Sequence, residues 1–203
     1  VTDPYQPIER DLRIMRRCME VCAEFRQPVA IITKNHLVTR DIDLFREMAR
    51  DHTISVALSL TSLDSKLASI MEPRASAPTA RLAAMRELSA AGVPVTVMTA
   101  PILPRINDHE VPALLAAAAE AGATSAGYVV LRLPHQIKAL FTEWLQRHFP
   151  ERAAHVESVL RQMRGGALYD SEWFSRQKGE GVFAAQLKAT FKFHLKRQSI
   201  QHN

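Results

Sequence analysis

The stretch Val93–Asp108, VPVTVMTAPILPRIND, decides the fold, because it passes from an apolar run into a proline-containing polar loop. Residues 93–100 have the composition of a buried strand, and the loop brings Asn107 and Asp108 to the end of that strand. A second such loop is MEPRASAP at residues 71–78. In parallel α/β proteins, loops at the carboxyl ends of the strands converge on one edge, where ligands bind. The two loops therefore predict a ligand site.

Outward from this stretch, apolar runs alternate with helical patterns along most of the chain. Strands are predicted at 28–33, 53–59, 93–100 and 125–131, and helices at 8–26, from 41, at 79–91, 107–122, 137–145, 156–163 and 187–195. The run at 28–33 is continuously apolar, as in a strand that is buried on both faces. Asn107 is expected to cap the next helix, with Glu110 completing a variant of the capping box. The alternation predicts an α/β fold with a parallel sheet, either open or closed into a barrel.

The two ends of this pattern give the expected domain organisation. A parallel α/β unit normally begins with a strand, whereas this chain begins with a loop before a helix. We therefore expect that at least one strand lies upstream of Val1. Gly165 and Gly166 interrupt the pattern, so the α/β part is predicted at 1–166, and a C-terminal loop and helix extension at 167–203.

Composition places the chain among ordinary globular proteins. Its 203 residues are 47% hydrophobic and 23% charged, and 26 basic against 21 acidic residues give a net charge of +5. No apolar run is long enough to span a bilayer and no secretion leader is visible, so we expect a cytoplasmic protein without a membrane partner. Cys18 and Cys22 are too few for a disulfide framework, and no metal ligand set is predicted within this chain.

Polar residues gather at the predicted strand ends. Lys34 follows the first strand, Ser59 ends the second, Asn107 follows the third, and Thr2 and Asp3 are expected to follow a strand upstream. A lysine directly after a buried strand is costly unless it meets an anion or a polar ligand. Lys34 is therefore predicted either to contact a ligand or to reach solvent at the rim.

Two charged patterns leave alternatives open. Glu72 and Arg74 either pair with each other across Pro73, or Arg74 faces an anionic ligand. Lys188 and Lys192 share a helix face with Lys196, which is typical of a solvated surface but also permits contact with nucleic acid. No Walker loop, Gly-x-Gly-x-x-Gly motif or Gly-x-Ser-x-Gly elbow occurs in the sequence.

Taken together, these motifs resemble the radical SAM superfamily, and most of all its branch related to spore photoproduct lyase, also described as DNA-repair-photolyase-like. The matching segments are residues 2–9, 32–35, 59–61, 72–78, 81–82, 100–104, 107–108 and 128–134. They extend over nearly all of the chain up to Gly166. Each segment is weak alone, but their order and spacing are fairly specific.

The resemblance implies a partial barrel of about six βα units, of the (βα)6 type, that lacks its first strand or strands here. It also implies S-adenosylmethionine (SAM) and a 4Fe-4S cluster as cofactors. Enzymes of this family cleave SAM to a 5′-deoxyadenosyl radical. By position, Thr2 and Asp3 would hold the methionine amino group, and Lys34 and Ser59 its carboxylate or the ribose. Asn107 would lie near the adenosine, and Leu131 would face the adenine.

The chain departs from the family pattern at two places. The three-cysteine loop that holds the cluster is not in this sequence, and Cys18 and Cys22 cannot replace it, so its ligands are expected upstream. Arg105 occupies a position after Pro104 where relatives usually have glycine. If the backbone there has a positive φ, an arginine is strained at this position, whereas a glycine is not.

These features support a radical SAM enzyme of unresolved reaction type, of which this chain would be an inactive part. Its substrate is unknown and possibly related to nucleic acid. The expected partners are SAM, an electron-donor protein and possibly nucleic acid. The alternative is a non-catalytic α/β module that binds nucleic acid through its basic C-terminal helix. A third interpretation is an aldolase-like barrel in which Lys34 forms a Schiff base.

Overall fold

A computed structural model describes residues 2–168 and 177–202, and its centre is a parallel sheet. The strands are β1 (Val29–Thr33), β2 (Ile54–Ser59), β3 (Val95–Ile102), β4 (Ser125–Val130) and β5 (Gln201–His202), in that spatial order. All neighbouring strands are parallel, so their carboxyl ends lie at one edge. This confirms the predicted α/β fold with a parallel sheet.

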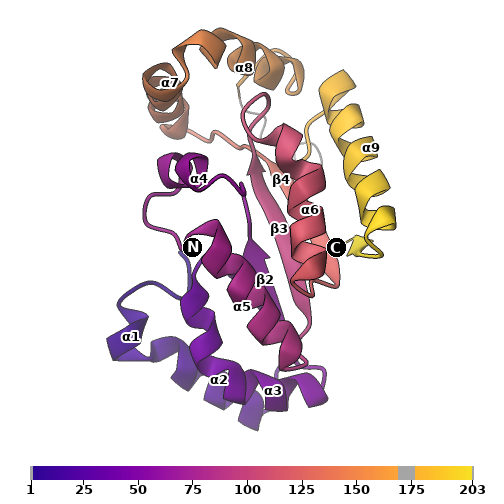
Figure 1. Ribbon diagram of the computed structural model, residues 1–203. Helices are drawn as coiled ribbons and strands as arrows, with labels where there is room; N and C mark the ends of the chain where they lie inside the picture. Colours follow the sequence, from indigo (N-terminus) through magenta and orange to yellow (C-terminus); the bar gives the residue numbers. More distant parts are fainter. Residues whose placement is uncertain (1, 169–176, 203) are drawn as a thin grey trace.

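Helices connect the strands and cover one face of the sheet (Figure 1). Between the strands lie α3 (Ile42–Arg50), α4 (Ser65–Met71), α5 (Pro78–Ala90) and α6 (Val111–Glu120), with short 3-10 turns at His36–Asp41 and Asp108–Glu110. Before the sheet come α1 (Glu9–Leu12) and α2 (Ile14–Glu24). After β4 come α7 (Ile137–His148) and α8 (Pro150–Gln162), and α9 (Gly181–Arg197) precedes β5.

The two faces of the sheet differ in residue size and exposure. Large side chains such as Val56, Leu58 and Val97 are fully buried in the core that the helices complete, and each contributes about 1.5–3 kcal/mol to stability. On the other face, Ile32 is 60% exposed, and Ala57 is half-buried. The prediction that residues 28–33 are buried on both faces is therefore wrong, because Ala30 and Ile32 on the second face of β1 are exposed and nothing within the described residues covers them.

Several local predictions need correction. The helix expected at 8–26 is divided into α1 and α2, because Arg13 adopts a left-handed conformation with φ 49°. The polar loop expected after β2 contains α4, whose first turn is capped by the side chain of Asp64. Asn107 does not cap the helix that follows it: its side chain makes no capping bond. Glu110 instead accepts hydrogen bonds from Ser62 and Leu63.

The C-terminal helix packs into the same core as the sheet. Leu187, Phe191 and Leu195 of α9 join the core cluster, and the Phe191 ring lies 4.7 Å from that of Tyr128 on β4. The short strand β5, which the sequence did not predict, pairs with Ser125 and Ala126. The proposed boundary after Gly166 stays a prediction, and residues 169–176 of the expected loop lie outside the described residues.

Within residues 2–168 and 177–202, no helix combines the length and apolar character needed to cross a membrane.

The turn after β3 contains the strained residue that the sequence pointed to. Arg105 has φ 65°, in the left-handed region that favours glycine. Its guanidinium lies 5.9 Å from the centre of the Phe183 ring, a cation–π contact that a truncated side chain would lose.

We expect Arg105→Gly to be more stable than Arg105→Ala by about 1 kcal/mol. Both variants lose the contact with Phe183, so the difference between them isolates the backbone conformation. Urea unfolding of the two variants measures it. Equal stability, or a more stable alanine variant, would show that the turn does not need positive φ.

Candidate ligand site at the carboxyl edge of the sheet

The N-terminal segment is fastened to the end of β1 by Asp3. The Asp3 carboxylate accepts hydrogen bonds from the Thr33 hydroxyl at 2.6 Å, the Lys34 amide at 2.7 Å and the Tyr5 amide at 2.9 Å. A carboxylate with three donors is both charge-stabilised and fixed in orientation. Asp3 therefore lies at the carboxyl edge of the sheet, where the sequence placed it.

Tyr5 anchors the same segment from the other side. Its side chain is fully buried, and its hydroxyl donates a 3.0 Å hydrogen bond to the carboxylate of Asp41. The same carboxylate accepts a hydrogen bond of 2.7 Å from the guanidinium of Arg40. Burial, followed by the charge of Asp41, raises the pKa of Tyr5 far above its ordinary value. Tyr5 is thus a neutral donor at physiological pH, and it holds residues 3–5 in place.

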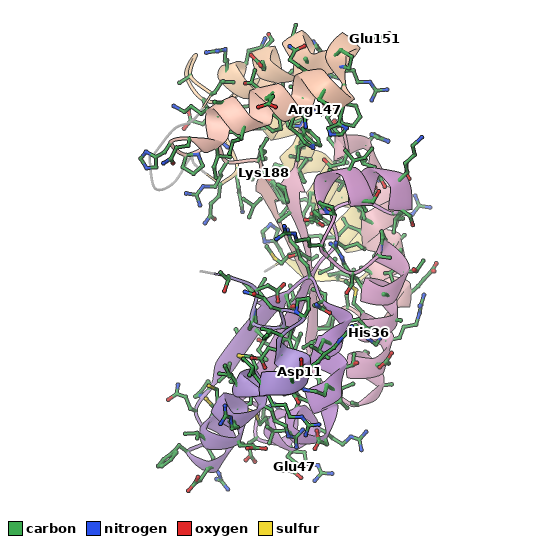
Figure 2. All side chains as sticks on the ribbon, turned by 90° about the vertical axis from the view of Figure 1, so that its left-hand side faces the viewer. Asp11, His36, Glu47, Arg147, Glu151 and Lys188 are labelled. Carbon is green, nitrogen blue, oxygen red and sulfur yellow. The ribbon has the colours of Figure 1, made fainter. Side chains whose placement is uncertain are left out.

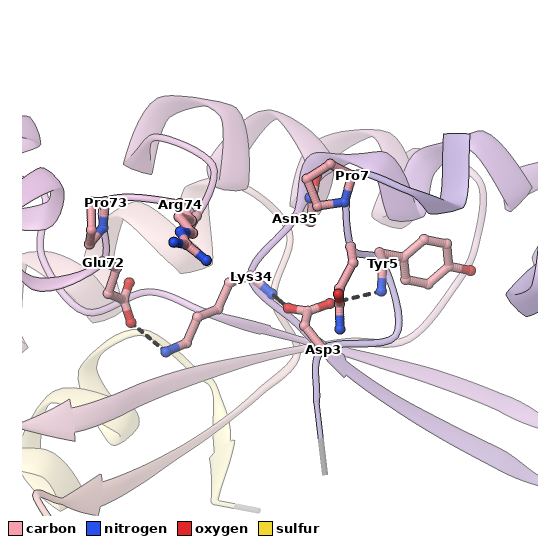
Figure 3. Close-up of a pocket in the computed structure, with 10 residues that line it drawn as sticks. Asp3, Tyr5, Pro7, Lys34, Asn35, Glu72, Pro73 and Arg74 are labelled. Atoms are coloured by element: carbon pink, nitrogen blue, oxygen red, sulfur yellow. Dashed lines mark hydrogen bonds and ion pairs between the residues drawn. The ribbon is translucent and has the colours of Figure 1, made fainter. Parts of the chain in front are cut away.

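The centre of the site is the carboxylate of Glu72. It accepts hydrogen bonds from Arg81 at 2.7 Å and from the Thr61 hydroxyl at 3.0 Å, and it forms an ion pair with the ammonium of Lys34 (Figure 3). Burial by itself raises the pKa of Glu72, but the charges of Arg81 and Lys34 outweigh it, so the pKa of Glu72 is lowered. Glu72 is therefore charged, and in the described residues its ion-pair partners are Lys34 and Arg81, not Arg74, the partner that the sequence suggested.

Arg81 fixes Glu72 from beneath. Its side chain is buried on α5, and it also donates to the carbonyl oxygens of Ser59 at 2.9 Å and Ser76 at 2.7 Å. The sequence carries a signal for this residue. Arg81 shares the helical spacing of the buried residues Met85 and Leu88, and an arginine on such a stripe indicates a buried ion pair.

Two cavities adjoin at this edge. The polar one, of about 840 Å³, is lined by Asp3, Lys34, Glu72 and Arg74 among others. The apolar one, of about 310 Å³, is lined by residues 71, 101, 103, 131, 137, 140, 141 and 144. Met71 lines one cavity and its neighbour Glu72 lines the other, so the two are next to each other. The lining of the two cavities suits a ligand that has a charged end and an apolar end.

Asn107 shapes the apolar cavity from beneath. It is 2% exposed, and its side chain accepts from the Leu103 amide at 2.7 Å and donates to the carbonyl oxygens of Pro101 at 3.1 Å and Thr61 at 2.8 Å. Pro101 and Leu103 both line the cavity. The side chain of Asn107 thus holds the loops after β2 and β3 together.

The structure brings the predicted site residues to one edge of the sheet. Lys34 lines the polar cavity with Asp3, and Leu131 lines the apolar one. Thr2 is exposed beside Asp3. Ser59 and Asn107 are buried just beneath and line neither cavity. Direct contact of these six residues with a ligand stays a prediction.

The expected cluster has no site in the described part of the chain. Among residues 2–168 and 177–202, no group of three or more histidine, cysteine or acidic side chains is placed to hold a metal ion. Cys18 is exposed on α2, and Cys22 packs against the core. The residues present therefore do not fit an iron–sulfur cluster, which needs about three or four cysteine ligands.

Replacing Glu72 tests the centre of the site. Glu72→Gln leaves Arg81 and Lys34 without a counter-charge, so we expect the free energy of unfolding at pH 7 to fall by about 3 kcal/mol. The control is Glu87→Gln, since Glu87 forms a surface pair with His36 and should contribute about 0–1 kcal/mol.

The variant Glu72→Gln should also change how the free energy of unfolding depends on pH. Folding lowers the pKa of Glu72 from its ordinary value of 4.5. The contribution of the Glu72 carboxylate to the free energy of unfolding is therefore complete above pH 4.5, and it is lost as the pH falls through the pKa of the folded state. Urea unfolding between neutral and acid pH should show that Glu72→Gln lacks this loss. A variant that is as stable as the wild type at pH 7 would refute the assignment.

Comparison with known proteins agrees with this geometry. Residues 3–118, more than half of the chain, match the model of the radical SAM superfamily. The uncharacterized protein Rv2578c of Mycobacterium tuberculosis is 35% identical over 163 residues, which are 79% of this chain and 48% of that protein. The uncharacterized protein MJ0683 of Methanocaldococcus jannaschii is 31% identical over 110 residues, 54% of this chain and 41% of its own length. The chain thus spans about half the length of these relatives.

Solved structures show the same fold. Two mutant structures of spore photoproduct lyase superpose with a TM-score of 0.68 at 16% sequence identity, covering 96% of this chain and 56% of theirs. At that identity the likeness concerns the fold, which is the α/β fold of the radical SAM barrel in that enzyme. The family match and the fold agree, and the chain belongs to the radical SAM superfamily.

Proposed function

We propose that the full-length protein is a radical SAM enzyme that binds S-adenosylmethionine across the two adjoining cavities. The observation that carries the proposal is that Asp3, Lys34 and Arg74 line one cavity beside an apolar one that contains Leu131. SAM has an ammonium and a carboxylate at one end and an adenine ring at the other. Opposite charges in the first cavity and apolar walls in the second complement those groups.

The charged cavity orients the methionine end of the ligand. Asp3 attracts the ammonium, with Thr2 beside it, while Lys34 and Arg74 attract the carboxylate. Lys34 already has one carboxylate partner in Glu72, which holds its ammonium at the cavity wall. Preorganised charges of this kind lower the cost of ordering side chains when the ligand binds.

The apolar cavity takes the adenine. Leu131 and Pro101 supply apolar surface, and Asn107 sets the position of Pro101. Ser59 helps to hold Arg81 in place, because its carbonyl oxygen accepts a hydrogen bond from the Arg81 guanidinium. In this proposal Ser59 and Asn107 do not contact SAM but position residues around the two cavities.

The 4Fe-4S cluster, held by residues outside the described part of the chain, would supply the electron for SAM cleavage. The residues described here bind and orient SAM and exclude water from it. The substrate, the reaction type, an electron-donor protein and the cytoplasmic location stay predictions. The Schiff-base interpretation of Lys34 also stays a prediction.

The proposal predicts a defect in SAM binding when Lys34 is removed. Lys34→Ala in the full-length protein should weaken SAM binding by roughly 10-fold or more, the value of one charged hydrogen bond. Isothermal titration calorimetry measures the dissociation constant, and Lys66→Ala on the exposed side of α4 is the control. Unchanged affinity in Lys34→Ala would contradict the proposal.

Iron analysis tests the other half of the proposal. After anaerobic reconstitution, the 203-residue polypeptide should hold no cluster, because the described residues offer no ligand set. The full-length protein should hold about four irons per chain. About four irons on the 203-residue polypeptide would overturn the first expectation, and none on the full-length protein would overturn the second.

A further inference from the structure

A third cavity lies away from the proposed SAM site, at the edge of the sheet beside α9. It has a volume of about 800 Å³ and is lined by Lys178, Lys188, Lys192, Phe193, Leu195, Lys196, Ile200 and His202. We call it the lysine groove. It shares no lining residue with the polar or the apolar cavity, so it is a separate cavity.

The lysine groove collects basic residues from three parts of the chain. Three of its lysines come from α9, Lys178 from the segment before that helix, and His202 from β5. In Figure 2, Lys188 is labelled above the middle of the molecule, whereas His36 and Asp11 are labelled in the lower half. A solvated helix face explains the three lysines on α9, but it does not explain why other elements bring further basic groups to the same cavity.

Among the described residues, no acidic side chain lines the lysine groove or pairs with its lysines. None of the groove residues is acidic, and within the described residues none of its four lysines takes part in a salt bridge shorter than 4.0 Å. Like charges in one cavity repel each other, and a concave wall concentrates their field. Such a site binds an anion that carries several charges.

The arrangement of the groove favours an extended anion with flat groups. Lys188, Lys192 and Lys196 are four residues apart, which places them about 6 Å apart along the helix axis. Phe193 lies among them with 62% of its surface exposed, so it contributes little to the core. A row of cations with an exposed aromatic ring is the arrangement by which proteins hold single strands, through phosphates and stacked bases.

We propose that the lysine groove binds single-stranded nucleic acid, with the lysines on successive phosphates and Phe193 stacked on a base. An acidic protein surface would also meet the lysines. It would leave Phe193 without a partner of its own, and this difference allows the two occupants to be separated by experiment.

The test measures binding of a fluorescein-labelled oligothymidylate of about 20 nucleotides by fluorescence anisotropy over a range of salt concentrations. With about four phosphate contacts, the logarithm of the affinity should fall with the logarithm of salt with a slope of about −3. The combined variant Lys188→Ala, Lys192→Ala and Lys196→Ala should reduce the steepness by about 2 and the affinity by at least about 10-fold.

The matched control is Arg10→Ala, Arg46→Ala and Arg86→Ala, three exposed residues on other helices, which lowers the net charge by the same amount. It should change neither the slope nor the affinity by more than about twofold. Circular dichroism melting verifies that both combined variants remain folded.

Phe193→Ala separates nucleic acid from other polyanions. It should weaken oligothymidylate binding by at least about fivefold through lost stacking, while competition by poly-glutamate is unaffected. The proposal is overturned if the lysine variant binds like the wild type, or if the arginine control loses as much affinity. It is also overturned if Phe193→Ala has no effect and poly-glutamate competes as well as the oligonucleotide, which would identify an acidic protein as the occupant.

Discussion

The buried carboxylate of Glu72 is the interaction on which the site depends. It joins the loop after α4 to Arg81 on α5, to Thr61 after β2 and to Lys34 after β1. A charge removed from water is stable only with partners that replace its hydration. Because each partner comes from a different element, satisfying this one charge fixes three loops relative to one another. The shape of the polar cavity follows from that requirement.

The sheet carries this arrangement because its two faces have different roles. The face that α3, α5 and α6 cover holds large apolar side chains and provides the stability. The other face is lined by smaller and partly exposed residues such as Ala57. The carboxyl edge between the two faces is where buried polar groups meet solvent. A ligand can reach it without disturbing the core, as expected of parallel α/β folds.

The sequence predicted the sheet and the edge of the site, but not the pairing of its charges. Strands and helices follow from local periodicity, so the four strands β1 to β4 and most helices were found. The helical stripe that contains Arg81 indicates a buried ion pair but not its partner, so the Glu72–Arg81 pair was missed. The hydrogen bonds of the Asn107 side chain leave no pattern in the sequence, so Asn107 was wrongly given a capping role. Strand β5 is two residues long and pairs only through tertiary contact, and α4 is a short helix in a polar stretch. The positive φ of Arg105 could be anticipated only through the family resemblance, because relatives usually have glycine at this turn position.

The central claim is that the charges around Glu72 form one wall of a binding site for SAM. A crystal structure of the full-length protein with SAM tests it most directly. We predict that Lys34 Nζ lies within hydrogen-bond distance of the methionine carboxylate, that Glu72 keeps its contact with Arg81, and that the adenine lies against Leu131. SAM bound elsewhere, with the polar cavity filled only by solvent, would contradict the account.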